Sequence, residues 1–224
     1  NNKLSFEYQK IIAEKISAKK NFGINSKVEI LMKKYFFHTS STKSFTQIII
    51  KILSKKISSK FKVRSNTEKF STDNNYFIEQ LIGNIIKGKE SFFLQRQILD
   101  NIDKIPKKKF KTKKTIRYFK KILFDSKNKD KLILLNDLGI ISKIIPEFSD
   151  IIHKTQFDRF HSMTVDQHTL RAINILKDIN ESPNNSSYKL AKRIYDKNPN
   201  RHAIFYALLL HDIGKGKKGD HNVI

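Results

Sequence analysis

The chain has 224 residues, 38% of them hydrophobic and 11% aromatic, which is enough to bury the core of one large or two small domains. It contains no cysteine, which excludes disulfide bonds and thiolate metal sites. The longest apolar run, residues 203–210, is far shorter than the roughly 20 residues of a membrane span, and the first residues lack a signal-peptide pattern. We therefore expect a soluble, cytoplasmic protein with no membrane partner.

The formal net charge is +24 at pH 7, but its distribution disfavours a nucleic-acid partner. Only seven of the 45 basic residues are arginines, the side chain best suited to clamping phosphates. The lysines are spread along the whole chain beside many isoleucines and asparagines, a composition typical of A/T-rich coding sequence with lysines on solvated faces. The charge can still steer an acidic partner or a phosphate ester to the surface.

Few glycines and prolines, together with apolar residues at helical spacing, predict an all-α fold. The first helix is predicted over residues 4–16. A longer helical region starts near Asn25, breaks at residues 38–44 and then resumes. Residues 48–50 could form a short strand, but the surrounding periodicity favours a helix. The polar residues 58–75 are predicted to be a loop.

The middle of the chain continues the helical pattern. A helix pair is predicted over residues 77–86 and 91–102, followed by an amphipathic segment over 107–124 whose lysines face solvent. A short helix should then end near Gly139, and a further turn should stop at Pro146. None of these segments carries obvious chemistry.

Residues with chemistry begin after this region, first in residues 163–179. This segment starts like a capping box, with Thr164 followed three positions later by Gln167. His168 then falls in the first turn of the helix, where the backbone amides concentrate partial positive charge. On its own, such a histidine is more often structural than functional.

A second polar element follows the apolar residues 203–210, which predict a core helix that ends in His211-Asp212, with Gly214 suited to close it. Burying an ionisable pair is costly unless a partner compensates, and imidazole and carboxylate together suit Mn²⁺, Mg²⁺, Fe²⁺ or Zn²⁺. Adjacent helical side chains diverge by about 100°, so other helices must add ligands, for which His168 is the candidate. Alternatively, Asp212 caps a neighbouring element and His211 is a core histidine.

These elements resemble the HD phosphohydrolase superfamily. More narrowly, residues 146–176 (PEFSDIIHKTQFDRFHSMTVDQHTLRAINIL) and 208–221 (LLLHDIGKGKKGDH) are similar to the bifunctional PII uridylyltransferase/uridylyl-removing enzymes. Residues 2–14 and 28–49 resemble the helical region that follows the nucleotidyltransferase core of that family. The resemblance spans nearly the whole chain and is loosest over residues 60–125.

The resemblance implies a set of site residues. The metal ligands would be His168, His211 and Asp212, around Mn²⁺ or Mg²⁺, with Fe²⁺ or Zn²⁺ as alternatives. His211, Asp212 and Lys215 would be catalytic. Substrate or phosphate contacts would come from Lys215, Lys217, His161 and His221, whereas His38, His153 and His202 are assigned to the surface or the core. For Lys215, a helix-end lysine that complements the helix dipole is an equally good interpretation.

The activity implied is hydrolysis of the UMP-tyrosyl phosphodiester on the PII nitrogen-regulatory protein, with glutamine as an effector through regions outside this chain. Residues 1–150 would be the helical region after the transferase core, and 151–224 the first part of the HD domain. The last HD aspartate is expected beyond Ile224 and the transferase signature before Asn1. We therefore expect an interior fragment that is inactive alone.

The chain departs from the family pattern in two places. Gln167 replaces the usual glutamate, which removes a charge near the site, and a polar residue follows His161 where the family often has an aromatic one. A further ambiguity keeps alternatives open. The segment HDIGK also occurs in the cyclic-dinucleotide branch, although that branch continues toward a Pro-Asp turn and this chain continues with GKKGDH. The alternatives are an HD hydrolase of another nucleotide, such as a cyclic dinucleotide or an RNA end, and a non-catalytic basic helical module.

Overall fold

The computed structural model describes residues 4–16, 23–58, 77–89, 92–155, 163–181 and 186–217. Within these ranges every regular element is a helix and none is a strand, which confirms the predicted all-α class. In the same ranges, no helix combines the length and the hydropathy needed to cross a membrane. The predicted loop over residues 58–75 lies outside the described residues, apart from Ser58 at the end of a helix.

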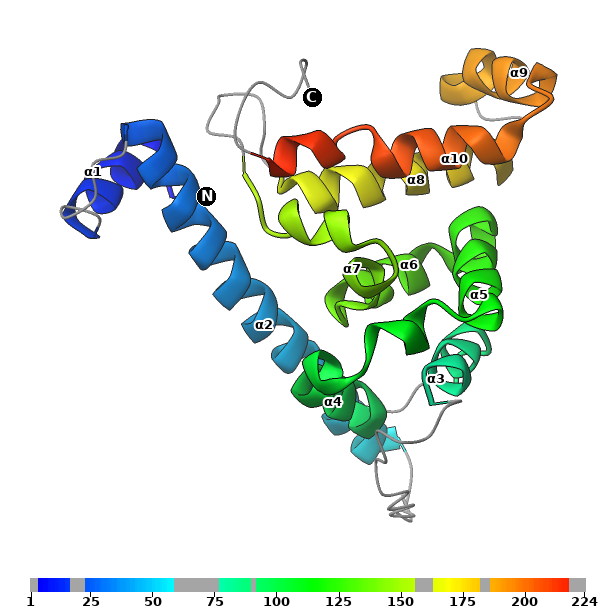
Figure 1. The fold of residues 1–224 in the computed structure, drawn as a ribbon, viewed down its shortest axis with the longest axis horizontal. Coiled ribbons are helices and arrows are strands. Elements are labelled where there is room, and N and C mark those ends of the chain that lie inside the picture. Colours follow the sequence, from blue (N-terminus) through cyan, green and yellow to red (C-terminus); the bar gives the residue numbers. More distant parts are fainter. Residues whose placement is uncertain are drawn as a thin grey trace.

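Ten α-helices and six 3₁₀-helices lie in the described residues (Figure 1). The α-helices are α1 (Phe6–Ile16), α2 (Ile24–Ser58), α3 (Phe77–Ile86), α4 (Phe92–Asn101), α5 (Lys113–Phe124), α6 (Lys129–Asp137), α7 (Ile140–Ile144), α8 (Val165–Glu181), α9 (Lys189–Lys197) and α10 (Arg201–Leu210). The 3₁₀-helices are η1 (Ile102–Lys104), η2 (Lys107–Phe110), η3 (Ser126–Asn128), η4 (Pro146–Asp150), η5 (Ser186–Tyr188) and η6 (Ile213–Gly216).

Helix α2 is one continuous helix, so the break predicted at residues 38–44 was wrong. The serines and threonines there do not interrupt the backbone hydrogen bonds. Instead, the hydroxyls of Thr39, Ser41 and Thr42 each donate to the carbonyl oxygen four residues earlier, at 2.9 Å. This arrangement accommodates short polar side chains inside a helix. Residues 48–50 are helical, as the periodicity favoured.

The main hydrophobic core runs from α3 to α10 and includes the fully buried rings of Phe110, Phe148 and Phe205. Gly139 ends α6 with a positive φ of 70°, and Pro146 opens η4, so both predicted stops are confirmed. A separate small cluster, Ala13, Val28 and Met32, holds α1 against α2. The core is continuous across residue 150, because side chains on both sides of that position belong to one cluster.

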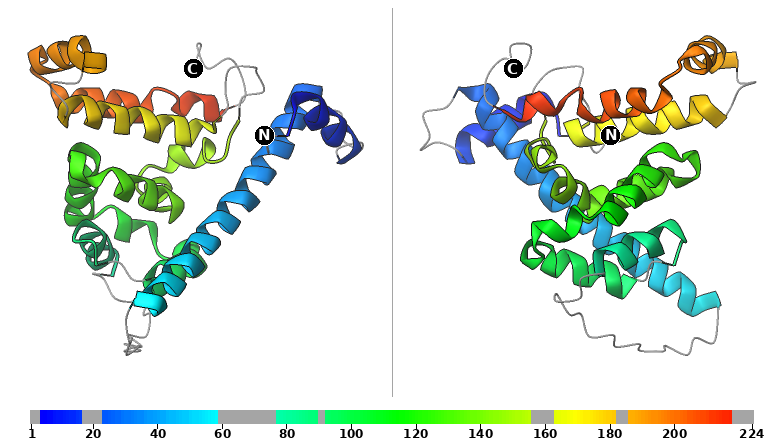
Figure 2. Two further views of the ribbon diagram at one scale, coloured as in Figure 1. Left: turned by 180° about the vertical axis from the view of Figure 1, so that it is seen from behind. Right: turned by 45° about the vertical axis from the view of Figure 1, so that its right-hand side comes forward.

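Helices α8 and α10 lie side by side along one edge of the molecule, with α5, α6 and α7 beneath them and α2 running obliquely past the other side (Figures 1 and 2). Only Phe205 and Leu209 of α10 are buried, whereas Ala203, Ala207 and Leu210 are exposed. The predicted core helix therefore contributes only some of its residues to the core. The reason is that α10 packs by one face, mainly on α8, and its opposite face is open.

Two predicted local details also differ. Helix α10 ends at Leu210, and Gly214 lies inside η6 without a positive φ, so this glycine does not close the helix. At the start of α8, Thr164 is fully buried and its hydroxyl has no hydrogen-bond partner among the described residues, so no side-chain capping box forms. Asp166, rather than Gln167, makes the hydrogen bonds at this end of the helix.

Candidate metal centre

Helix α8 places His168 at the edge of the core. Its buried face consists of apolar residues at helical spacing, among them Leu170, Ile173 and Leu176, and packs against α6 and α10. His168 lies off this face in the first turn, so its imidazole is exposed. The packing of α8 thus fixes the position from which His168 reaches toward the neighbouring helix.

The second part of the site comes from the end of α10. The C-cap residue is His211, whose backbone N–H still donates to the carbonyl oxygen of Ala207, at 2.9 Å. Asp212 follows at the turn into η6 and is buried, with 7% of its surface exposed. The pair therefore presents one exposed imidazole and one buried carboxylate.

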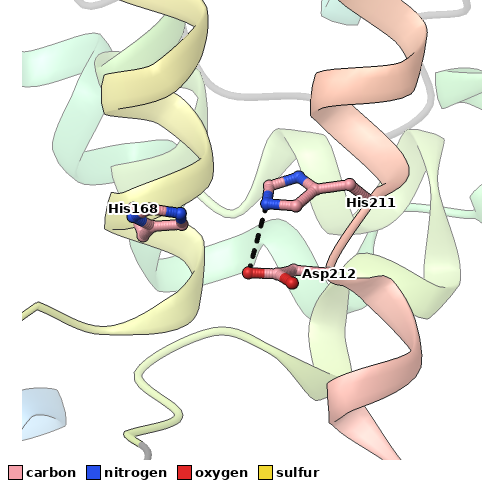
Figure 3. Close-up of side chains that lie close together, drawn as sticks. All are labelled: His168, His211 and Asp212. Carbon is pink, nitrogen blue, oxygen red and sulfur yellow. Dashed lines mark ion pairs between the residues drawn. The ribbon is translucent and has the colours of Figure 1, made fainter. Parts of the chain in front are cut away.

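The three residues meet between α8 and α10 (Figure 3). Each offers one ligand atom, and these atoms all lie within 4.8 Å of one another. The two imidazole rings have centroids 5.7 Å apart and are tilted by 56°. Two exposed imidazoles above a buried carboxylate form a site that is open to solvent on one side.

The hydrogen bonding of His211 indicates which of its nitrogens can bind a cation. Its Nδ1 lies 2.7 Å from the carbonyl oxygen of Leu208, which can only accept, so Nδ1 must carry a proton. In the neutral ring, Nε2 then has the free lone pair, and it lies 3.3 Å from Oδ2 of Asp212. These two acceptor atoms lie close enough together to share one bound cation. The donor set, its spacing and this tautomer all fit a divalent cation.

Lys215 is part of the same cluster. Its Nζ lies 2.9 Å from each carboxylate oxygen of Asp212, and its side chain is only 13% exposed. The ammonium therefore neutralises the buried carboxylate from the side of η6. This contact places Lys215 beside the candidate ligands, and its predicted role toward the phosphate stays a prediction.

The other predicted site residues do not join this cluster in the described part of the chain. Lys217 is exposed at the end of η6. His161 and His221 lie outside the described residues. Of the histidines assigned to the surface or core, His202 stacks on Phe124 with ring centroids 4.1 Å apart, and His153 is half-buried.

Three residues near the site were not singled out from the sequence. Asp166 is 1% exposed and bonded to two other segments, Lys154 contacts the backbone of η6, and Gly216 packs tightly on Asp150. The sequence held a signal only for Asp166. It falls one helical turn before Leu170 on the apolar stripe of α8, and a carboxylate on such a stripe needs buried partners.

Comparisons with known proteins agree with this geometry. Residues 165–224, which contain all three candidate ligands, match the HD domain family. Similar proteins named bifunctional uridylyltransferase/uridylyl-removing enzyme occur in Ruegeria pomeroyi (36% identity, 58% of this chain and 14% of the relative), Novosphingobium aromaticivorans (37%, 44% and 11%) and Caulobacter vibrioides (43%, 39% and 9%). No solved structure matches.

The aligned segments span only about a tenth of the length of these relatives. Within that span, the resemblance drawn from the motifs is confirmed by identities of 36–43%. Residues 165–224 are thus similar to HD domains, and the aligned segments of the chain are similar to the bifunctional uridylyltransferase/uridylyl-removing enzymes.

Proposed function

We propose that this chain supplies the metal centre of a uridylyl-removing hydrolase, which cleaves the UMP-tyrosyl phosphodiester on a PII signalling protein. The observation that carries the proposal is the meeting of His168, His211 and Asp212, from segments more than 40 residues apart in the chain, within 4.8 Å. The names of the similar proteins supply the substrate class, since each includes a uridylyl-removing activity.

In this proposal the two imidazoles and the carboxylate hold the cation, Mn²⁺ or Mg²⁺. A bound divalent cation would lower the pKa of a water molecule and neutralise phosphoryl oxygens. The Leu208 carbonyl holds the His211 ring in the tautomer that leaves Nε2 available. Lys215, which lies beside Asp212, offers an ammonium to the phosphate, and the exposed Lys217 is a further candidate for that contact.

The division into residues 1–150 and 151–224 stays a proposal about function. The hydrophobic core runs across this boundary, so the two parts share one core rather than each having its own. The candidate ligands all lie after it, and the HD family match begins at residue 165. The roles of His161 and His221 likewise stay predictions from the resemblance, as does an effector role for glutamine.

The test uses an intact enzyme that contains residues 1–224, because this stretch alone is expected to be inactive, and the His211→Ala variant of that enzyme. We expect the wild type to bind Mn²⁺ in a calorimetric titration and to release UMP from uridylylated PII, and the variant to lose both. His202→Ala is the matched control, because it removes an exposed imidazole from the same helix at a position stacked on Phe124. It should retain both metal binding and hydrolysis.

Other outcomes separate the alternatives. Mn²⁺ binding with hydrolysis of a cyclic dinucleotide or an RNA end, but not of uridylylated PII, would support a different HD hydrolase. No Mn²⁺ binding by the wild type would leave the non-catalytic helical module. If the His211→Ala variant hydrolyses uridylylated PII at the wild-type rate, His211 is not a ligand of a catalytic metal ion.

A further inference from the structure

A short turn, residues 151–154, contacts both halves of the candidate metal centre. On the α8 side, the backbone N–H of Val165 donates to the Lys154 carbonyl oxygen at 2.8 Å. The backbone N–H of His153 donates to Oδ1 of Asp166 at 3.1 Å. Asp166 lies two residues before His168, so these two bonds fix the start of the helix that presents this ligand.

The same turn holds the segment that follows the His211-Asp212 pair. The Lys154 ammonium donates to the carbonyl oxygen of Lys215 in η6. Just before the turn, Asp150 packs so closely on Gly216 that a Cβ atom at this glycine would lie 2.4 Å from the Asp150 Cβ. The 151–154 turn therefore bridges the two segments that carry the ligands.

Asp166 is the most constrained member of this arrangement. Its side chain is 1% exposed, and its second oxygen, Oδ2, accepts from Nδ2 of Asn136 on α6 at 3.0 Å. It also holds His153, whose positive φ of 56° is a strained backbone conformation for a non-glycine residue. Three segments, α6, the turn and α8, are thus joined through one carboxylate.

We propose that Asp166 and Lys154 are positioning residues of the metal centre, which act through the 151–154 turn to set the separation of His168 from His211 and Asp212. This inference rests on the proposed function, because it assumes that these three residues bind a cation. Neither positioning residue is among the candidate ligands; each acts on the backbone segments that carry them.

The experiment is a Mn²⁺ titration of the intact protein and two variants of α8. We expect Asp166→Ala to raise the Mn²⁺ dissociation constant by about 10- to 100-fold, as loss of supporting interactions does at metal sites. The control is Asp178→Ala, which removes a carboxylate from the same helix at a partly buried ion pair with Lys129. It should leave the dissociation constant within about twofold of wild type.

A conservative variant distinguishes positioning from charge. Asp166→Asn keeps an oxygen that can accept from the backbone N–H of His153. The new amide NH₂ group can donate to Asn136 once the side-chain amide of Asn136 rotates by about 180°. This rotation brings in Oδ1 of Asn136, which has no hydrogen-bond partner among the described residues. We expect Mn²⁺ affinity within a few-fold of wild type. Affinity as low as that of Asp166→Ala would contradict positioning by hydrogen bonds.

If Asp166→Ala does not fold, Lys154→Met tests the other side of the turn, with Lys143→Met, which breaks an ion pair with Asp103, as its control. Mn²⁺ affinity should fall in Lys154→Met and stay at the wild-type value in Lys143→Met. Folded Asp166→Ala and Lys154→Met proteins with wild-type Mn²⁺ affinity would overturn the inference and leave the proposed function intact. Failure of the wild type to bind Mn²⁺ would instead overturn both.

Discussion

At the scale of single residues, α8 buries two charged side chains on its apolar stripe. Asp166 is one of them, and Lys177, which is 0% exposed, is the other. The Lys177 ammonium donates to the Ile122 carbonyl oxygen at 2.8 Å and lies 3.5 Å from that of Asn128. It thereby satisfies the Ile122 carbonyl oxygen in the last turn of α5, where helical N–H donors run out, and also contacts the N-cap residue of α6.

Lys177 predicts a distinct pH dependence of stability. Burial lowers its pKa from 10.5 to about 8, so between these values the unfolded chain binds more protons than the folded protein. The contribution of Lys177 to the free energy of unfolding must then rise with pH across that window, by up to about 3 kcal/mol, and is least favourable below pH 8. In Lys177→Met this rise should vanish.

The measurement is urea unfolding of both proteins from pH 7 to pH 10, compared as a difference at each pH. At pH 7 the variant also leaves the Ile122 and Asn128 carbonyl oxygens without their donor, a loss of about 1–3 kcal/mol. If the difference in free energy of unfolding between the two proteins stays constant with pH, the pKa of Lys177 is not lowered by burial.

Gly216 provides a second prediction at this scale. Gly216→Ala would place a Cβ 2.4 Å from the Asp150 Cβ and 3.3 Å from its backbone carbon, so η6 or η4 must shift. We expect a loss of about 1–3 kcal/mol in the free energy of unfolding, measured with urea. Gly23→Ala is the control, because a Cβ there meets nothing within 4 Å. Equal stability of the two variants would show that η6 does not pack as described.

At the scale of elements, the N-terminus of α5 depends on one threonine. Thr112 Oγ1 accepts from the backbone N–H of Thr115 at 3.1 Å and donates to Oε1 of Glu79 on α3 at 2.7 Å. The same side chain thus caps α5 and connects it to α3, against which α5 packs. This pairing explains how a helix with so many lysines holds its place in the core.

We expect Thr112→Ala to lower the free energy of unfolding by about 1–2 kcal/mol, because it removes a helix cap and a hydrogen bond to a buried glutamate. Thr42→Ala makes the same chemical change in the middle of α2, at an exposed position. It should change stability by less than about 0.5 kcal/mol. Equal effects in thermal or urea unfolding would contradict the cap.

At the scale of the whole molecule, the candidate metal centre joins α8 to α10, two of the helices that enclose the core. A cation that binds the folded state alone must stabilise it by mass action. At a free Mn²⁺ concentration 100 times the dissociation constant, we expect about 2.7 kcal/mol. Thermal unfolding with Mn²⁺ and with a chelator measures the effect.

His211→Ala should unfold at the same temperature with and without Mn²⁺, whereas His202→Ala should respond as the wild type does. A Mn²⁺-induced stabilisation that survives in His211→Ala would place the cation elsewhere in the protein.

The sequence by itself determined the helical class and the stops near Gly139 and Pro146, and it singled out His168, His211 and Asp212 as candidate ligands. These features follow from the spacing of apolar residues, from the special backbone conformations of glycine and proline, and from short sequence motifs. The resemblance added the HD domain, which the comparisons confirmed.

Only the tertiary structure decided how these parts meet. It made α2 continuous, left one face of α10 exposed, and replaced a capping box by the bonds of Asp166 to Asn136 and His153. The contacts of Lys154 and Gly216 with η6 and η4 likewise join residues about 60 positions apart. Local periodicity reports which side of a helix is apolar, but not which backbone lies opposite, and that is set by packing between distant segments.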